Sequence, residues 1–143
     1  MNYTPKTGER ILSESELVTV SANERRSSYY PVGTEFDFSV PIQLIGYESS
    51  AKRPLVKFAG VFKNGKETTV PATMIMRVPF QNAEVIEKTE FQKQLNACTN
   101  AKAVWDLIKG RKVRVSDIVT VSEKPYGEDT ARDVKYSVFD LVQ

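Results

Sequence analysis

The stretch EFDFSVPIQL, residues 35–44, carries the clearest structural signal in the chain. Its apolar residues occupy every second position over ten residues, which is the period of a β-strand with one face toward a core and the other toward water. This pattern is typical of antiparallel sheets. Because Pro41 cannot donate a ladder hydrogen bond, we expect the strand to lie at a sheet edge or to contain a bulge.

Residues 55–78 contain the strongest short-range signal for a β-hairpin, an Asn64-Gly65 pair between two apolar-rich runs. Both central residues of a type I′ turn need positive φ, which asparagine and glycine tolerate best. We therefore expect two strands joined by a two-residue turn, with arms that reach residues 55 and 78. The register that follows pairs Lys63 with Lys66 and Val61 with Thr68.

Helical periodicity is convincing in one region, residues 89–109. Thr89 followed three residues later by Gln92 has the form of a capping box, and Gly110 is placed to end a helix. We expect two short helices or one broken helix. The residues that recur at helical spacing near its start are Phe91, Leu95 and Cys98, and the single cysteine is expected to lie in the core.

Further strands are expected on both sides of the helical region. A short one near the N-terminus places Val18 and Val20 on one side. Two longer ones span residues 112–121 and 134–142 and are joined by a polar loop around Pro125. Since helix does not alternate with strand one for one, this order favours an antiparallel sheet over a doubly wound fold.

These elements predict a mainly β protein of the β-rich α+β type, an antiparallel barrel or sandwich with a short helical insert near residues 89–109. A chain of 143 residues falls in the size range of one domain. Residues 1–14 are polar and lack periodicity, so we expect an extended N-terminal arm. Residues 15–143 then form a single β-rich domain.

The composition argues against several classes of protein. No apolar run approaches the ~20 residues that cross a bilayer, so no membrane partner is expected. The N-terminus lacks a basic region followed by an apolar stretch, which favours cytoplasmic synthesis. Twenty Lys and Arg against eighteen Asp and Glu leave a net charge of +2, far below the excess typical of an obligate duplex-binding protein.

The side chains that most enzymes rely on are missing. The chain has no histidine and a single cysteine, so it lacks the commonest general base, the histidine-dependent triads and the ligands of a zinc site. Phosphate-binding glycine loops are missing as well. We predict no enzymatic activity, no metal and no cofactor. A carboxylate-dependent enzyme is the third alternative, with Glu35 and Asp37 on one strand face as its catalytic pair. Glu128, Asp129 and Asp133 could form a metal site, but we favour a solvated acidic turn there, and an exposed polar strand face for Glu35 and Asp37.

A set of basic and aromatic residues raises the alternative of an OB-like protein that binds single-stranded nucleic acid. Such proteins combine cations for phosphates with aromatic rings, and each stacked base contributes ~1–3 kcal/mol. The competing interpretation, which we favour, is that the tyrosines before the first clear strand pack against the end of the sheet. The candidate binding residues are Arg25, Arg26, Tyr29, Tyr30, Lys52, Arg53, Arg111, Lys112 and Arg114.

The stretches SELVTVSANERRSSYYPVGTEF, residues 15–36, and VWDLIKGRKVRVSDIVTV, residues 104–121, resemble in style the small uncharacterised proteins of tailed bacteriophages. This resemblance implies a structural or accessory protein of the phage particle, and it assigns no role to an individual residue. We therefore expect foremost a non-enzymatic subunit of a larger protein assembly, which for a phage protein is the virion. Its contacts with its own or other subunits are expected through the N-terminal arm and the sheet edges.

Overall fold

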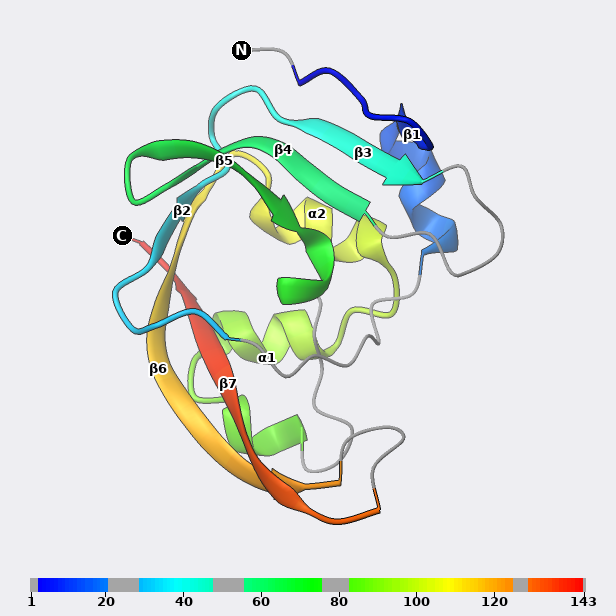
Figure 1. Cartoon of the computed structure of the whole chain (residues 1–143). Helices are drawn as coiled ribbons and strands as arrows, with labels where there is room; N and C mark the ends of the chain where they lie inside the picture. Colours follow the sequence, from blue (N-terminus) through cyan, green and yellow to red (C-terminus); the bar gives the residue numbers. More distant parts are fainter. Residues whose placement is uncertain (1–2, 21–28, 48–55, 76–82, 125–128, 143) are drawn as a thin grey trace.

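The structure is a computed structural model that describes residues 3–20, 29–47, 56–75, 83–124 and 129–142. In this part of the chain, seven strands form one antiparallel sheet in the order β1-β3-β4-β2-β6-β7, with β5 paired to β4 (Figure 1). The predicted mainly β class is confirmed. In chain order the elements are β1 (Glu9–Ile11), η1 (Glu14–Thr19), β2 (Glu35–Asp37), β3 (Gln43–Tyr47), β4 (Val56–Lys63), β5 (Lys66–Pro71), η2 (Ala72–Met74), η3 (Ala83–Ile86), α1 (Glu90–Asn96), α2 (Ala101–Ile108), β6 (Lys112–Glu123) and β7 (Arg132–Leu141).

The hairpin β4–β5 has the predicted turn and register. Asn64 and Gly65 both have positive φ, 51° and 83°, and the pairs Lys63–Lys66 and Val61–Thr68 face each other. The return arm is shorter than expected, because β5 ends at Pro71 and the chain enters η2. Position 78, the expected end of that arm, lies outside the described residues.

The helical insert consists of two short helices with side-chain caps. Thr89 Oγ1 accepts a hydrogen bond from Gln92 N at 2.9 Å, and Asn100 Oδ1 accepts one from Ala103 N at 2.9 Å. Gly110 follows α2 with φ of +74°, a conformation that favours glycine at the end of a helix. Cys98, between the helices, is buried as expected.

The alternating stretch at residues 35–44 does not form the single strand that its periodicity predicts. It forms β2 and β3, which both pair with the same edge of β4. The chain advances six residues from Asp37 to Gln43, while their partners on β4, Phe62 and Ala59, are three residues apart. The missing N–H of Pro41 lies within this interruption, so the ladder breaks where the backbone lacks a donor.

The sheet curves around α1 and α2 and, within the described residues, does not close into a barrel (Figure 1). At its β7 edge, a helix takes the place of a further strand. Thr89 Oγ1 donates to Phe139 O at 2.6 Å, and Phe139 N donates to Gln92 Oε1 at 2.9 Å. These bonds satisfy backbone groups that an edge strand otherwise presents to other chains.

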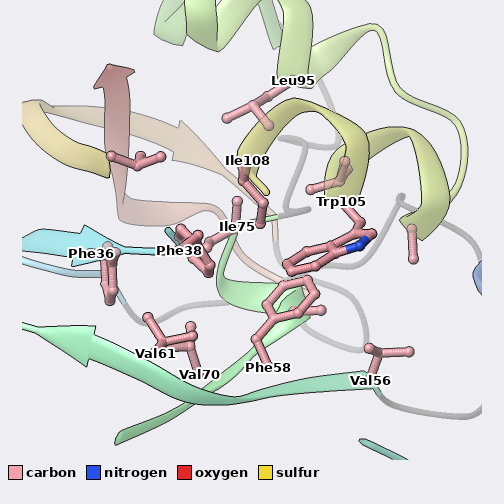
Figure 2. Close-up of a cluster of buried hydrophobic side chains, with 14 of the residues drawn as sticks. Phe36, Phe38, Val56, Phe58, Val61, Val70, Ile75, Leu95, Trp105 and Ile108 are labelled. Atoms are coloured by element: carbon pink, nitrogen blue, oxygen red, sulfur yellow. The ribbon is translucent and has the colours of Figure 1, made fainter. Parts of the chain in front are cut away.

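The main core lies between the sheet and the two helices. Figure 2 shows Leu95 from α1 and Ile108 from α2 pointing toward the aromatic side chains of the strands. Phe58 stacks on Trp105 with ring centres 5.4 Å apart, and its other neighbour Phe38 meets it edge to face at 5.8 Å. Such pairs add ~0.5–1.5 kcal/mol to the burial of their apolar area.

A second, smaller core lies on the other face of the β6–β7 ribbon. Val138 and Phe139 are consecutive in β7 and therefore point to opposite faces, yet both are buried. Phe139 belongs to the main core, whereas Val138 packs with Ile86 of η3 and with Tyr136. Both faces of this part of the ribbon are thus covered.

The prediction of a short strand around Val18 and Val20 is wrong, because this segment forms the 3-10 helix η1. The backbone N–H of Ser13 donates to Glu16 Oε1 at 3.0 Å, which fixes the first turn of that helix. Leu17 is fully buried and Val18 is 53% exposed. One-sided spacing of valines was the wrong signal here, since the local cap determines the conformation.

The polar N-terminal segment is bonded to the sheet of its own domain. β1 pairs with β3, and Glu9, whose side chain is 1% exposed, forms an ion pair with Lys57 of β4 at 2.6 Å. Glu9 also accepts hydrogen bonds from Tyr3 OH at 2.7 Å and from Lys6 N at 3.0 Å. The Lys57 ammonium, followed by the Lys6 N–H, lowers the pKa of Glu9 from 4.5 to about 2.

We predict that Phe38→Ala lowers the free energy of unfolding by about 3–5 kcal/mol, because it removes a large side chain that is 1% exposed. Asp37→Ala, on the neighbouring outward position, is the matched control and should lower it by less than about 1.5 kcal/mol. Urea denaturation measures both values. Equal losses for the two variants would contradict the assignment of the inward face.

We predict that Glu9→Gln lowers the free energy of unfolding by about 1–3 kcal/mol at neutral pH. The pKa of Glu9 is lower in the folded chain, so the unfolded chain binds the proton more tightly. The stabilisation by this carboxylate is therefore complete above about pH 4.5 and is lost as the pH falls toward about 2. Urea denaturation across this range should show the two proteins converging in acid, and a constant difference would rule this interpretation out.

Candidate functional site

The structure separates the two tyrosines of the predicted nucleic-acid set. The Tyr30 ring packs edge to face on Phe36 with ring centres 4.9 Å apart, and its backbone N–H donates to Ser137 Oγ at 2.7 Å. Tyr29 is 41% exposed, and Lys135 Nζ lies 5.6 Å from its ring centre. The members of the set that lie outside the described residues are Arg25, Arg26, Lys52 and Arg53.

Two other members of the set, Lys112 and Arg114, lie on the outward side of β6. They alternate with the buried residues Val113 and Val115, so strand geometry directs both cations away from the main core. Arg111 precedes the strand, and its carbonyl accepts a hydrogen bond from Phe38 N at 2.8 Å. The structure therefore brings together Lys112 and Arg114 on one surface.

The same surface holds the carboxylates considered for catalysis. In the antiparallel pairing of β2 with β6, Glu35 lies opposite Arg114 and Asp37 lies opposite Lys112. We call this surface the charged face and define it by these four residues together with Phe62 of β4, which lies opposite Asp37. Each cation of the charged face has a carboxylate directly across the ladder, an arrangement that stabilises strand pairs.

Asp37 is held in its ionised form. Its Oδ1 accepts hydrogen bonds from the hydroxyl of Ser39 and, at 2.8 Å, from the backbone N–H of Ser39. The hydroxyl bond first, then the N–H and the Lys112 charge, lower the pKa of Asp37 below its ordinary value. A carboxylate of this kind accepts hydrogen bonds at neutral pH and does not supply a proton.

The tip of the β4–β5 hairpin is fastened to the charged face. Asn64 N donates to Glu35 O at 2.9 Å, and Glu35 N donates to Asn64 Oδ1 at 2.8 Å. Asn64 therefore serves the turn through its positive φ and serves the tertiary fold through its side chain. The sequence indicated the first role, whereas the second depends on which strand lies beside the turn.

Two shallow pockets flank Lys112. One, of about 380 Å³, lies on the β4 side and includes Phe62, Asp37 and the hairpin tip in its lining. The other, of about 440 Å³, lies on the β7 side and includes Leu141 and Val142. Each pocket thus combines an apolar residue with Lys112, a composition that suits contact with another protein surface.

Other chemistry is sparse in the described part of the chain. Within these residues, no three His, Cys, Asp or Glu side chains are grouped so that they could hold a metal ion. Of the acidic turn, Asp129 and Asp133 are exposed, and Glu128 lies outside the described residues. No described helix has the length and hydrophobicity needed to span a bilayer.

Comparisons with models of known protein families, with curated proteins and with solved structures find no match.

We predict that Asn64→Gly lowers the free energy of unfolding by about 1 kcal/mol, because it keeps the turn conformation and loses the bond to Glu35 N. Asn64→Ala should cost about 1–2 kcal/mol more, since alanine at positive φ is strained. Thermal and urea unfolding of the two variants separate the turn from the tertiary bond. If glycine matched the natural residue in stability, the tertiary role would be disproved.

Proposed function

We propose that this chain is a non-enzymatic structural or accessory subunit of a larger protein assembly and that it binds protein through the charged face. The observation that supports the proposal is the position of Phe62. This half-buried aromatic side chain points outward beside Asp37, Glu67 and a pocket that also contains Lys112. An aromatic anchor surrounded by charged residues of both signs is typical of protein interfaces.

The distribution of charge favours a protein partner over nucleic acid at this surface. A strand of nucleic acid that stacked a base on Phe62 would bring its phosphates near Asp37 and Glu67, which lie on either side of that ring. The cations that could compensate, Lys112 and Arg114, lie opposite carboxylates of their own domain. A protein surface can present both charges in alternation, whereas a phosphate backbone presents one sign.

A virion is the assembly that the resemblance to tailed-phage proteins suggests. Its subunits need surfaces that recognise protein, as the charged face could. They need no catalytic groups, which agrees with a chain that has no histidine and a single cysteine. Side-chain contacts at the sheet edges, without pairing of added strands, are a second part of the proposal. β1 and β5 lie at edges, and Ile11 of β1 is 52% exposed.

Single-stranded nucleic-acid binding is the second candidate function, and Tyr29 favours it. Its ring is exposed, and a lysine ammonium lies 5.6 Å from the ring centre. Proteins that bind single-stranded nucleic acid use such a pair, with the ring stacked on a base and the cation near a phosphate. The two arginines at positions 25 and 26 are close to it in sequence. This candidate predicts binding of oligo-dT that weakens steeply with salt.

We predict that Phe62→Asp releases the protein from its assembly. In a nuclease-treated extract of cells that produce the chain in its native context, the unmodified protein should sediment with other protein, and the variant should remain near the top of the gradient. Val18→Asp is the control, because Val18 is an exposed apolar residue that lies on η1 and outside the charged face. Circular dichroism checks that each variant is folded.

Two results would overturn the proposal. One is an unmodified protein that stays at the top of the gradient. The other is a complex that disappears on nuclease treatment, together with salt-sensitive binding of oligo-dT by the pure protein. The second result would move single-strand binding to first place.

A further inference from the structure

The charged face has a self-complementary order of side chains across the sheet. One row of outward residues runs from β4 through β2 and β6 to the residue after β7. Phe62 pairs with Asp37, and Asp37 pairs with Lys112. Val142 N donates to Lys112 O at 2.9 Å, which places Val142 beside Lys112. The row therefore reads apolar, acidic, basic, apolar.

A second row lies parallel to the first and has the same pair of acidic and basic residues at its centre. Asn64 is hydrogen-bonded to Glu35, Glu35 pairs with Arg114, and Arg114 pairs with Asp140. This row reads polar, acidic, basic, and then Asp140, an acceptor for an amide. In both rows the acidic residue belongs to β2 and the basic residue to β6, so one acidic column lies beside one basic column.

Such a face is complementary to itself. A two-fold axis that runs along the strands between β2 and β6 places the acidic column of one copy over the basic column of the other. Asp37 then faces the partner's Lys112, and Glu35 faces the partner's Arg114. The same rotation brings Phe62 to the partner's Val142, so the outer columns match as well. Sheets that pack face to face keep their strands roughly aligned, which is compatible with this axis.

The two pockets follow the same symmetry. The pocket that contains Phe62 and the pocket that contains Val142 lie on opposite sides of Lys112. The rotation therefore sets the first pocket of each copy against the second pocket of the other. An interface of this kind is isologous, since the same patch of both subunits takes part.

We infer that the partner bound by the charged face is a second copy of this chain, in a two-fold dimer whose axis runs between β2 and β6. This inference rests on the proposed function and names its partner. The charge order on the face favours a second copy because the two-fold rotation sets each charge of both columns against an opposite charge of the same surface. A dimer of this geometry is the unit that enters the larger assembly.

Charge exchange between copies tests the inference with the full chain. A face-basic variant carries Glu35→Lys and Asp37→Lys, and a face-acidic variant carries Lys112→Glu and Arg114→Glu. Sedimentation velocity at low salt should show the unmodified protein in a concentration-dependent equilibrium between monomer and dimer. The dimer affinity of each variant alone should fall by about tenfold or more, because like charges face each other. An equimolar mixture of the two should recover the dimer.

A variant with all four exchanges is the matched control for folding. Glu35→Arg, Asp37→Lys, Lys112→Asp and Arg114→Glu together keep opposite charges across the ladder and across the two-fold axis, so this protein should dimerise like the unmodified one. The inference is overturned by an unmodified protein that is monomeric at all concentrations. It is also overturned by a dimer that ignores the charge variants, or by a mixture of folded variants that stays monomeric.

These outcomes are separate from the test of the proposed function. A pure protein that is monomeric yet sediments with other protein in the nuclease-treated extract would refute the two-fold dimer and leave the proposed function standing. A protein that is monomeric in both experiments would refute both.

Discussion

The fold depends on the backbone hydrogen bonds of β4, which pairs with three strands. One edge of β4 binds β5 along its length, and the other edge is shared between β3 and β2. Gly60 makes this sharing possible. It has φ of +92°, and a Cβ at this position would lie 3.0 Å from Pro41 O, in the segment that links β2 to β3. A side chain here would press against the interruption that lets both strands fit.

Because β2 and β3 share one edge of β4, their outer edges are free to pair with different strands. β3 binds the N-terminal strand β1, and β2 binds β6, so the sheet extends in two directions from β4 and curves around the helices (Figure 1). The ion pair between the buried Glu9 and the partly exposed Lys57 stabilises the first of these two extensions, since it joins β1 to β4 across β3. The second direction carries the charged face.

The edges of the sheet are protected from strand pairing by different means, which leaves the charged face as the main surface of the proposed association. α1 covers β7 at Phe139, β1 has only three residues, and β5 carries Lys66, Glu67 and Pro71. Short strands, charged residues and proline are common means by which proteins avoid pairing between edges. The outward side of β2 and β6 keeps a regular pattern of opposite charges, which suits a specific and reversible contact.

Features that depend on residues a few positions apart could be determined from the sequence by itself. The Asn64-Gly65 turn, its register and the Thr89 cap are local, because positive φ or one side-chain bond to a nearby N–H specifies each of them. The outward placement of Lys112 and Arg114 follows from a local rule as well, since they alternate along β6 with the buried Val113 and Val115. The alternation at residues 35–44 also identified the buried side of Phe36 and Phe38.

Only the tertiary structure decided which strands share an edge and which charges meet. The period of residues 35–44 is that of one strand, but β2 and β3 part at the segment that contains Pro41, and each then has a different outer partner: β6 pairs with residues 35–37 and β1 with residues 45–47. Glu35 and Arg114 are far apart in the sequence, and no local pattern places one opposite the other. Pairing between distant strands is selected by the packing of the whole sheet, so the charge pattern of a face appears only when the strands are in register.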